Sequence, residues 1–155
     1  MKRLLLFSIV CLFTVAVMSQ TISKVNILQL DSLIKHTNQP LVVNFWATWC
    51  APCLEELPYI QKITAENNVL LVLVNLDTEA NYLSKLKDFI KSRQIKAVHL
   101  WLNETNADYF CPVIDESWSG AIPASLFINN KKNFRFFYEE KIPEARFREV
   151  IEKLK

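Results

Sequence analysis

The chain of 155 residues contains little glycine, little histidine and almost no net charge. Its only glycine, Gly120, cannot supply a dinucleotide-binding fingerprint or a phosphate-binding loop, since both need several glycines. Its only histidines, His36 and His99, exclude an HExxH zinc helix and a three-histidine metal centre. A net charge of +2 is too balanced for a nucleic-acid-binding surface. These absences disfavour nucleotide enzymes, zinc hydrolases and DNA-binding proteins, whereas the four cysteines keep thiol chemistry open.

The N-terminal segment, residues 1–19, differs in composition from the rest of the chain. Lys2 and Arg3 precede an uncharged run over residues 4–17, and Val17 and Ser19 are small residues at the positions that a signal peptidase reads. The run is shorter than the ~20 residues needed to span a membrane as a helix. We therefore expect a cleaved signal peptide with Gln20 as the first mature residue, and a retained N-terminal anchor is the alternative.

Export would place the cysteines in an oxidising compartment, where paired cysteines are either structural or catalytic. Cys11 lies in the leader and would be lost on processing. The mature part then keeps Cys50, Cys53 and Cys111. Because this number is odd, at least one thiol is free or pairs only transiently.

Residues 20–155 show no linker, repeat or low-complexity stretch and are predicted to form one domain. Two strongly apolar runs predict central strands covered by helices on both faces, and the helical segment between them completes a β-α-β unit. Residues 103–119 are polar and predicted to be irregular. The expected elements of the first half are a helix over 28–35, a strand over 41–46, a helix over 51–66 and a strand over 69–76. An amphipathic helix over 78–93 follows, with Leu83, Leu86 and Ile90 on its apolar face. The second half is expected to form a short strand over 97–102, a hairpin of strands 124–128 and 134–138 with an asparagine-rich turn, and a helix after Pro143. This order predicts an α/β, thioredoxin-like fold, with a central mixed β-sheet flanked by helices on both faces.

A Cys-x-x-Cys pair, Cys50 and Cys53, lies where the first buried strand gives way to a helix. The start of a helix carries unpaired N–H groups and a partial positive charge, which stabilise a thiolate and lower its pKa from about 8.5 to ~3.5–7.5. Pro52 fits the first helical turn, because its missing N–H has no partner there. Half of a zinc site and a purely structural disulfide are the alternatives, although the chain offers few further metal ligands.

Residues 42–58, VVNFWATWCAPCLEELP, resemble the active-site segment of the TlpA/ResA group of exported, thioredoxin-like thiol–disulfide oxidoreductases. A second segment, residues 118–128, is similar to the segment of that group that carries a cis-proline facing the two cysteines. The resemblance implies that Cys50 is the nucleophile, Cys53 the resolving thiol and Pro123 the cis-proline. An ordinary trans proline before a strand is the alternative for Pro123.

The resemblance also implies a role for Glu56. Cytoplasmic thioredoxins place a buried aspartate where this chain has Asn44, so the proton of Cys53 needs another acceptor. Glu56 follows Cys53 by three residues on the same helix face, and in the TlpA/ResA group a glutamate at this position is thought to tune the site. A solvated carboxylate on the helix surface is the alternative for Glu56, and we expect Glu55 to be a surface residue.

The remaining site residues would contact the substrate or line the site. The expected substrate-binding residues are Trp49, Ala51, Pro52, Ile122 and Pro123.

Other residues near these motifs have alternative interpretations. Trp46 is expected in the wall of the site, with core packing as its alternative, while Trp118 either lines the groove beside Pro123 or packs in the core. Cys111 is either a third redox thiol or an unreactive bystander, and His36 and His99 are expected to be surface or satisfied core residues.

Taken together, these patterns predict an exported, periplasmic or otherwise extracytoplasmic, thiol–disulfide oxidoreductase. We expect it to reduce protein disulfides without a cofactor or metal, and to receive electrons from a membrane thiol donor. It would have no nucleic-acid partner, and membrane contact only if the N-terminus is retained. The alternative is a thioredoxin-fold adaptor or chaperone in which the two cysteines are not catalytically essential.

Overall fold

The computed structural model describes residues 21–155, and the six strands of this part form one mixed sheet in the order β1-β4-β3-β2-β5-β6. Neighbouring strands from β1 to β2 are parallel, and β5 and β6 are antiparallel additions next to β2. The strands are β1 (Ile22–Val25), β2 (Leu41–Trp46), β3 (Leu70–Asn75), β4 (Val98–Leu102), β5 (Ala124–Asn129) and β6 (Phe134–Glu139). The expected leader and Cys11 lie outside the described residues.

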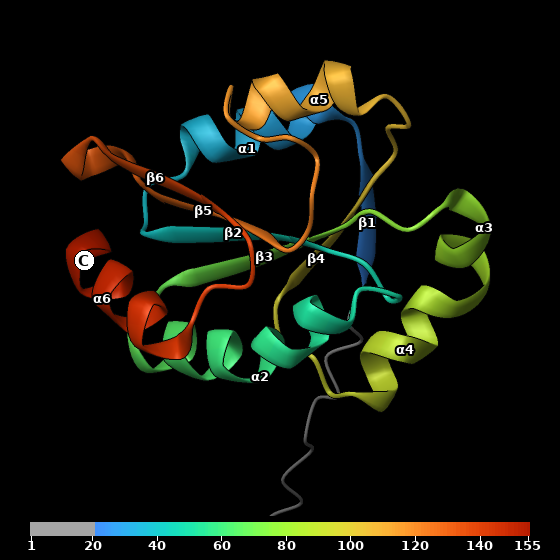
Figure 1. The fold of residues 1–155 in the computed structure, drawn as a ribbon, viewed down its shortest axis with the longest axis horizontal. Helices are drawn as coiled ribbons and strands as arrows, with labels where there is room; N and C mark the ends of the chain where they lie inside the picture. The colour runs from blue at the N-terminus through green and yellow to red at the C-terminus, as the bar shows by residue number, and fades with distance from the viewer. Residues whose placement is uncertain (1–20) are drawn as a thin grey trace, which may run out of the picture.

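Helices cover both faces of the sheet, as predicted, and form three layers with it (Figure 1). One face is covered by α1 (Ile27–His36) and α5 (Ala107–Ile114). The other is covered by α2 (Ala51–Glu66), α4 (Lys87–Ser92) and α6 (Glu144–Leu154). Each face therefore has its own hydrophobic core, and the strands at the centre separate the two.

The central strands are buried because their side chains are apolar on both faces. All six residues of β2 are buried, as are the last five of β3. Alternation along β2 sends Val42, Asn44 and Trp46 towards the α2 face, and Val43 and Phe45 towards the α1 face. A polar side chain, that of Asn44, thus lies inside the core next to the helix that carries the cysteines.

The predicted helix over 78–93 forms, but a π-helical turn interrupts it. The segment consists of α3 (Glu79–Asn81), the π-helix η1 (Tyr82–Leu86) and α4. Leu86 and Ile90 are buried, whereas Leu83 is 74% exposed, so its placement on the apolar face was wrong. The wider π turn shifts the phase of the helix, which an interpretation based on 3.6 residues per turn does not anticipate.

The prediction of an irregular segment over 103–119 was wrong, because α5 lies within it. The Asn106 side chain accepts a hydrogen bond from the N–H of Asp108 and so caps the helix, which buries Phe110, Cys111 and Ile114 against α1 and the sheet. Strand β1 was not predicted either. Its four residues are too few for a periodic pattern, and pairing with β4 places them in the sheet.

The C-terminal half follows the remaining predictions. The turn between β5 and β6 is a short 3-10 helix, η2 (Asn130–Lys132), followed by Asn133 with a positive φ of 51°. Helix α6 buries Phe147, Val150, Ile151 and Leu154 at the predicted spacing. Within residues 21–155, every helix is too short or too polar to cross a membrane.

Candidate active site

Cys50 and Cys53 form a disulfide at the start of α2, with their Cα atoms 5.3 Å apart. Cys50 is the N-cap residue of this helix, and its Sγ accepts a hydrogen bond from the N–H of Cys53 at 3.3 Å. Pro52 occupies the first turn, as predicted. Both sulfurs therefore lie where the unpaired N–H groups and the positive end of a 16-residue helix are concentrated.

The two cysteines differ in their contact with solvent. Cys50 retains 4% of its surface and Cys53 retains none. Cys53 is thus the more deeply buried of the two. Cys50 is less exposed in this oxidised state than an accessible nucleophile would be, because its sulfur is bonded to Cys53 and packs in the core cluster beneath α2.

The segment before β5 lies at the same edge of the sheet as the disulfide. Ala124 pairs with Phe45 near the end of β2, and Ile122 packs against the cluster that contains both cysteines. The Ile122–Pro123 peptide bond is cis, which agrees with the resemblance. The carbonyl oxygen of Pro123 accepts a hydrogen bond from the N–H of Glu140 at 3.0 Å.

Glu56 is fully buried one turn after Cys53, so a solvated position on the helix surface is wrong. Its Oε1 accepts a hydrogen bond from Nδ2 of Asn44 at 2.8 Å, and its Oε2 accepts one from the N–H of Ile142 at 3.1 Å. Asn44 also donates to Oγ of Ser125 at 3.0 Å. Asn44 and Ser125 face each other across β2 and β5, so the sheet register holds the carboxyl group in place.

Burial raises the pKa of Glu56 from its ordinary value of 4.5 to about 7. The hydrogen bonds from Asn44 and Ile142 and the charge of Lys141 oppose this rise but do not cancel it. A carboxyl group with a pKa near neutrality exchanges protons readily at physiological pH.

The neighbouring carboxylate, Glu55, has a different environment. It is exposed and forms an ion pair with Lys141, as expected for a surface residue. The two adjacent glutamates of α2 thus face opposite surroundings, and only Glu56 points into the core.

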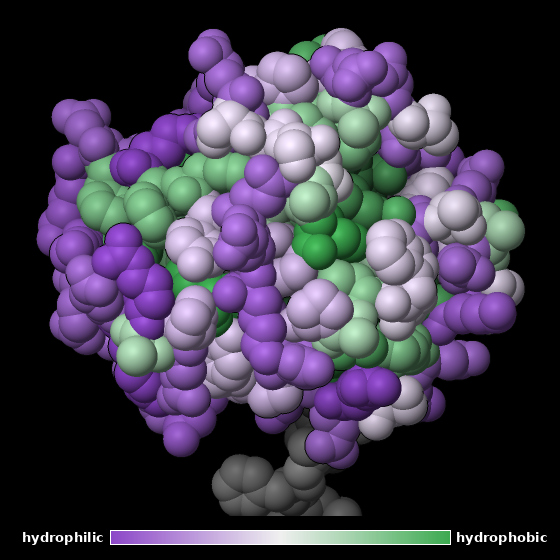
Figure 2. All heavy atoms as spheres, in the orientation of Figure 1, coloured by the Kyte–Doolittle hydropathy of each residue, from purple (hydrophilic) through white to green (hydrophobic). Residues whose placement is uncertain are grey.

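The residues next to Cys50 and Cys53 in the sequence are uncharged. Trp49 is 66% exposed, and Ala51 and Pro52 are exposed close to it in the sequence. In the segment before Pro123, Ala121 is exposed and Ile122 is half-buried. Elsewhere on the surface, hydrophobic side chains are visible among hydrophilic ones in the view of Figure 2. Trp46, in contrast, is fully buried and contacts Phe89, so its placement in the wall of the site was wrong.

The other singled-out residues have structural surroundings. Trp118 is buried in the core beneath α5, and its Nε1 donates to the carbonyl oxygen of Ala121 at 2.9 Å, which supports the segment before Pro123. Cys111 is a free, buried thiol whose pKa is raised to about 11, mainly by burial. His36 is exposed and contacts its own helix, and the buried Nε2 of His99 lies 3.0 Å from the carbonyl oxygen of Ile95.

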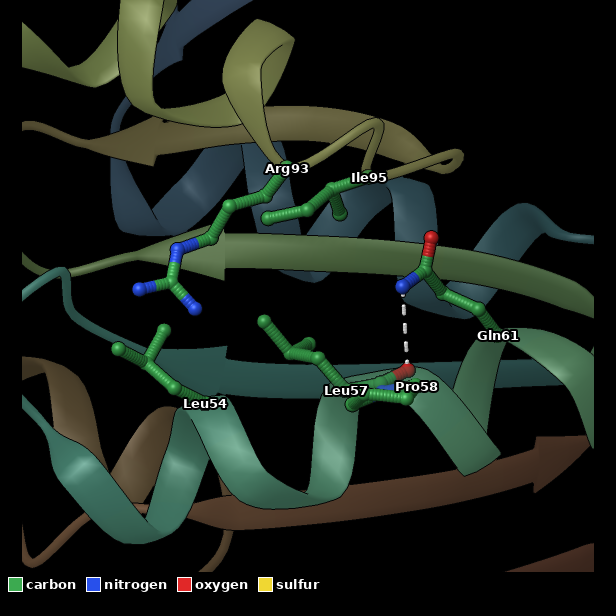
Figure 3. Close-up of a pocket in the computed structure, with 6 residues that line it drawn as sticks. All are labelled: Leu54, Leu57, Pro58, Gln61, Arg93 and Ile95. Atoms are coloured by element: carbon green, nitrogen blue, oxygen red, sulfur yellow. Dashed lines mark hydrogen bonds between the residues drawn. The ribbon is translucent and has the colours of Figure 1, made fainter.

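A pocket of about 210 Å³ lies along α2, away from the sulfur atoms. Leu54, Leu57, Pro58, Gln61, Arg93 and Ile95 line it, and Gln61 donates to the carbonyl oxygen of Leu57 within it (Figure 3). Neither cysteine belongs to this lining.

Among residues 21–155, no group of three or more His, Cys, Asp or Glu side chains could hold a metal ion. Half of a zinc site at Cys50 and Cys53 thus has no second half in the described part of the chain.

Three residues that support the site, Ser125, Ile142 and Asp77, were missed by the interpretation of the sequence. Ser125 and the N–H of Ile142 belong to the hydrogen bonds around Asn44 and Glu56. Asp77, just after β3, accepts hydrogen bonds from the segment that leads to Cys50. A polar residue within an apolar strand was a visible signal for Ser125, but nothing local to Asp77 pairs it with this segment.

Comparisons with known proteins agree with this site. The profile of the Redoxin family matches residues 28–117. Thioredoxin Y2, chloroplastic, of Arabidopsis thaliana is 24% identical over 103 residues, which are 66% of this chain and 56% of that protein. Sporulation thiol-disulfide oxidoreductase A of Bacillus subtilis (strain 168) is 34% identical over 68 residues, 42% of this chain and 41% of that protein. The chain thus spans about half the length of these curated relatives.

A solved structure shares the fold. A secreted disulfide oxidoreductase of Mycobacterium tuberculosis superposes with a TM-score of 0.56 at 16% identity, over 76% of this chain and 83% of that chain. The family match covers more than half of the sequence and includes both cysteines. The chain therefore belongs to the Redoxin family, and its thioredoxin fold with a Cys50–Cys53 pair is of the TlpA/ResA-like type that the sequence predicted.

Proposed function

We propose that this protein is an exported thiol–disulfide oxidoreductase that reduces disulfides in other proteins. One observation carries the proposal: the Cys50–Cys53 disulfide caps α2, and the buried Glu56 carboxyl lies one turn behind it. This arrangement supplies a nucleophile, a resolving thiol and a proton acceptor, which are the groups that disulfide exchange requires.

In the reduced protein, Cys50 starts the reaction. Its thiolate, stabilised by the N-terminus of α2, attacks one sulfur of the substrate disulfide. A mixed disulfide forms between Cys50 and that sulfur, and the other substrate sulfur leaves as a thiolate that takes up a proton.

Cys53 completes the exchange. Its thiol loses a proton to Glu56, whose pKa of about 7 suits this transfer, and the resulting thiolate attacks Sγ of Cys50. The Cys50–Cys53 disulfide forms and the second substrate thiolate leaves. Two electrons have then passed from the protein to the substrate, and thiols alone have carried them, so no cofactor takes part.

Substrate recognition would use the exposed residues next to Cys50. Trp49, Ala51 and Pro52 offer an uncharged contact area, and the backbone of Ile122, next to Pro123, is positioned to pair with an extended peptide. Two relatives are named as a thiol–disulfide oxidoreductase and a disulfide oxidoreductase, which supports a protein disulfide as the substrate.

We infer that net electron flow is towards the substrate. Strong oxidants of this chemistry stabilise the reduced form and have potentials near −120 mV, whereas reductants are near −270 mV. Ala51 and Pro52 add neither a charge nor a side-chain hydrogen-bond donor beside Cys50, so the reduced form has no obvious extra stabilisation. A potential above about −180 mV would instead indicate an oxidase or an isomerase.

The N-terminal segment supports export, and residues 20–155 would form the mature thioredoxin-like domain. Its leader-like pattern agrees with a fold relative that is described as secreted. An exported reductant needs electrons from the cytoplasm, so we infer a membrane thiol donor as its partner. The N-terminal segment would keep the protein at the membrane only if it is not cleaved.

The decisive experiment is insulin reduction by residues 20–155 with dithiothreitol as electron source. Cys50→Ser should abolish catalysis. Cys53→Ser, reduced and then mixed with insulin after removal of dithiothreitol, should accumulate a mixed disulfide that non-reducing gels resolve. Cys111→Ser is the matched control, and it should keep the wild-type rate because Cys111 is buried and burial raises the pKa of its thiol. If the wild type shows no acceleration, or the Cys50→Ser variant retains it, the adaptor or chaperone interpretation replaces catalysis.

A further inference from the structure

Asp77 is a buried carboxylate that the exchange steps above do not use. It retains 4% of its surface and follows β3 by two residues. Because β2 and β3 are parallel, their carboxyl ends meet at the same edge of the sheet, where Trp46 pairs with Asn75. Asp77 therefore lies at the edge from which the chain continues to Cys50.

Both polar groups of Thr48 that can donate hydrogen bonds are held by Asp77. The N–H of Thr48 donates to Oδ2 of Asp77 at 3.2 Å, and Oγ1 of Thr48 donates to Oδ1 at 3.0 Å. Thr48 precedes Cys50 by two residues, and the N–H of Cys50 closes the turn by donating to the carbonyl oxygen of Ala47 at 3.1 Å. The carboxylate thus fixes the turn that delivers Cys50 to the start of α2.

Asp77 is itself held firmly. Asn75 donates from Nδ2 to Oδ2 of Asp77 at 2.9 Å and accepts from the N–H of Asp77 at 3.0 Å. The indole N–H of Trp101 donates to the carbonyl oxygen of Asp77 at 2.8 Å, and Tyr82 stacks on the ring of Trp101. Because these hydrogen bonds fix Asp77, its carboxylate in turn fixes the position of Thr48.

The charge of Asp77 is not neutralised by an ion pair. The three groups that donate to the carboxylate are the N–H of Thr48, Oγ1 of Thr48 and Nδ2 of Asn75, and all of them are uncharged, an arrangement that fits the ionised form. Among residues 21–155, no Lys, Arg or His forms an ion pair with it. A negative charge therefore lies beside the segment that carries the nucleophile and opposes the positive end of α2.

We propose that Asp77 is a positioning residue for Cys50, which it holds through Thr48, and that its charge disfavours the Cys50 thiolate and so the reduced form. The inference rests on the proposed function. The charge of Asp77, which lies outside the Cys-x-x-Cys motif, would thus favour the disulfide form of the Cys50–Cys53 pair, as a reductant requires.

The test compares redox equilibria in glutathione buffers at a fixed pH for the wild type and Asp77→Asn. Asparagine keeps the shape but removes the charge, so the reduced form should gain at least about threefold in population. Since tenfold corresponds to ~30 mV, the potential should rise by at least about 15 mV. Asp88→Asn is the charge-matched control, because Asp88 is exposed on α4. The reduction potential of this variant should equal that of the wild type. Equal potentials in Asp77→Asn and Asp88→Asn would overturn the electrostatic role.

A second variant, Thr48→Val, keeps the charge of Asp77 but removes the hydroxyl donor. It should slow insulin reduction several-fold without raising the potential, whereas Asp77→Asn should change both. Wild-type rates in Thr48→Val would overturn the positioning role, and this holds even if Asp77→Asn fails to fold by circular dichroism. If the wild type itself reduces no insulin, the proposed function fails rather than this inference.

Discussion

Replacing Glu56 by glutamine should change how the stability of the oxidised protein depends on pH. Burial holds the pKa of this carboxyl at about 7, whereas its ordinary value is 4.5. Between these values the folded protein holds a proton that the unfolded chain has released. The contribution of Glu56 to stability is therefore full below pH 4.5 and is lost as the pH rises through about 7.

The size of the effect follows from the two pKa values. A difference of one unit between the pKa values of the folded and unfolded states corresponds to about 1.4 kcal/mol. Glu56 alone should therefore lower the free energy of unfolding by about 2.5 kcal/mol between pH 5 and pH 8. Glutamine cannot ionise and removes this slope. It also loses one of the two hydrogen bonds that Asn44 and Ile142 donate to Glu56, a cost of about 1–3 kcal/mol that does not vary with pH.

Urea unfolding of the oxidised proteins at pH 5, 6, 7 and 8, followed by tryptophan fluorescence, measures the effect. The oxidised form is used because Cys50 and Cys53 do not titrate when they are joined in a disulfide. The difference between the wild type and Glu56→Gln should change by about 2.5 kcal/mol over this range. Glu55→Gln is the matched control, since Glu55 is the exposed neighbour on the same helix, and its curve should run parallel to that of the wild type.

A difference between the wild type and Glu56→Gln that stays constant with pH would refute the reasoning. It would mean that the hydrogen bonds from Asn44 and Ile142 outweigh burial and hold the pKa of Glu56 near its ordinary value. Glu56 would then be permanently ionised at neutral pH and poorly matched to accept the proton of Cys53.

Three further outcomes are expected. Iodoacetamide added to the reduced protein near pH 6 should label Cys50 before Cys53, since Cys53 has no exposed surface, and peptide mapping checks this order. Trp49→Ala should raise KM for a protein disulfide about fivefold or more, because an exposed aromatic contact is lost, while Leu83→Ala, equally exposed on η1, should leave KM unchanged in the same steady-state assay. Cys111→Ala should keep the rate of insulin reduction within roughly twofold of the wild type, since burial raises the pKa of this thiol to about 11, and labelling of the folded wild type at Cys111 at pH 8 would contradict this.

Much of the fold was predictable because its signals are local. The apolar runs of β2 and β3 and the i, i+3, i+4 spacing of Phe147, Val150 and Ile151 specify buried strands and an amphipathic helix without reference to distant residues. Where the prediction was wrong, at Leu83 and in α5, the local pattern was altered by a π turn or obscured by polar flanking residues.

The position of the redox site was also encoded locally. A Cys-x-x-Cys pair between a buried strand and a helix places Cys50 at the helix N-terminus whatever the rest of the chain does. The sequence alone thus determined where the two cysteines lie, and the family resemblance implied their roles as nucleophile and resolving thiol.

The surroundings of that pair depended on the tertiary structure. Glu56 is buried because Ile142, 86 residues away, donates to it, and because Asn44 bridges it to Ser125 across 81 residues. Asp77 reaches Thr48 across 29 residues. Short-range periodicity carries no information about which distant donors will meet a given carboxylate, because that depends on strand order and register in the assembled sheet. Whether Glu56 is solvated or buried, and whether a charge lies behind Cys50, was therefore decided only when the sheet brought these segments together.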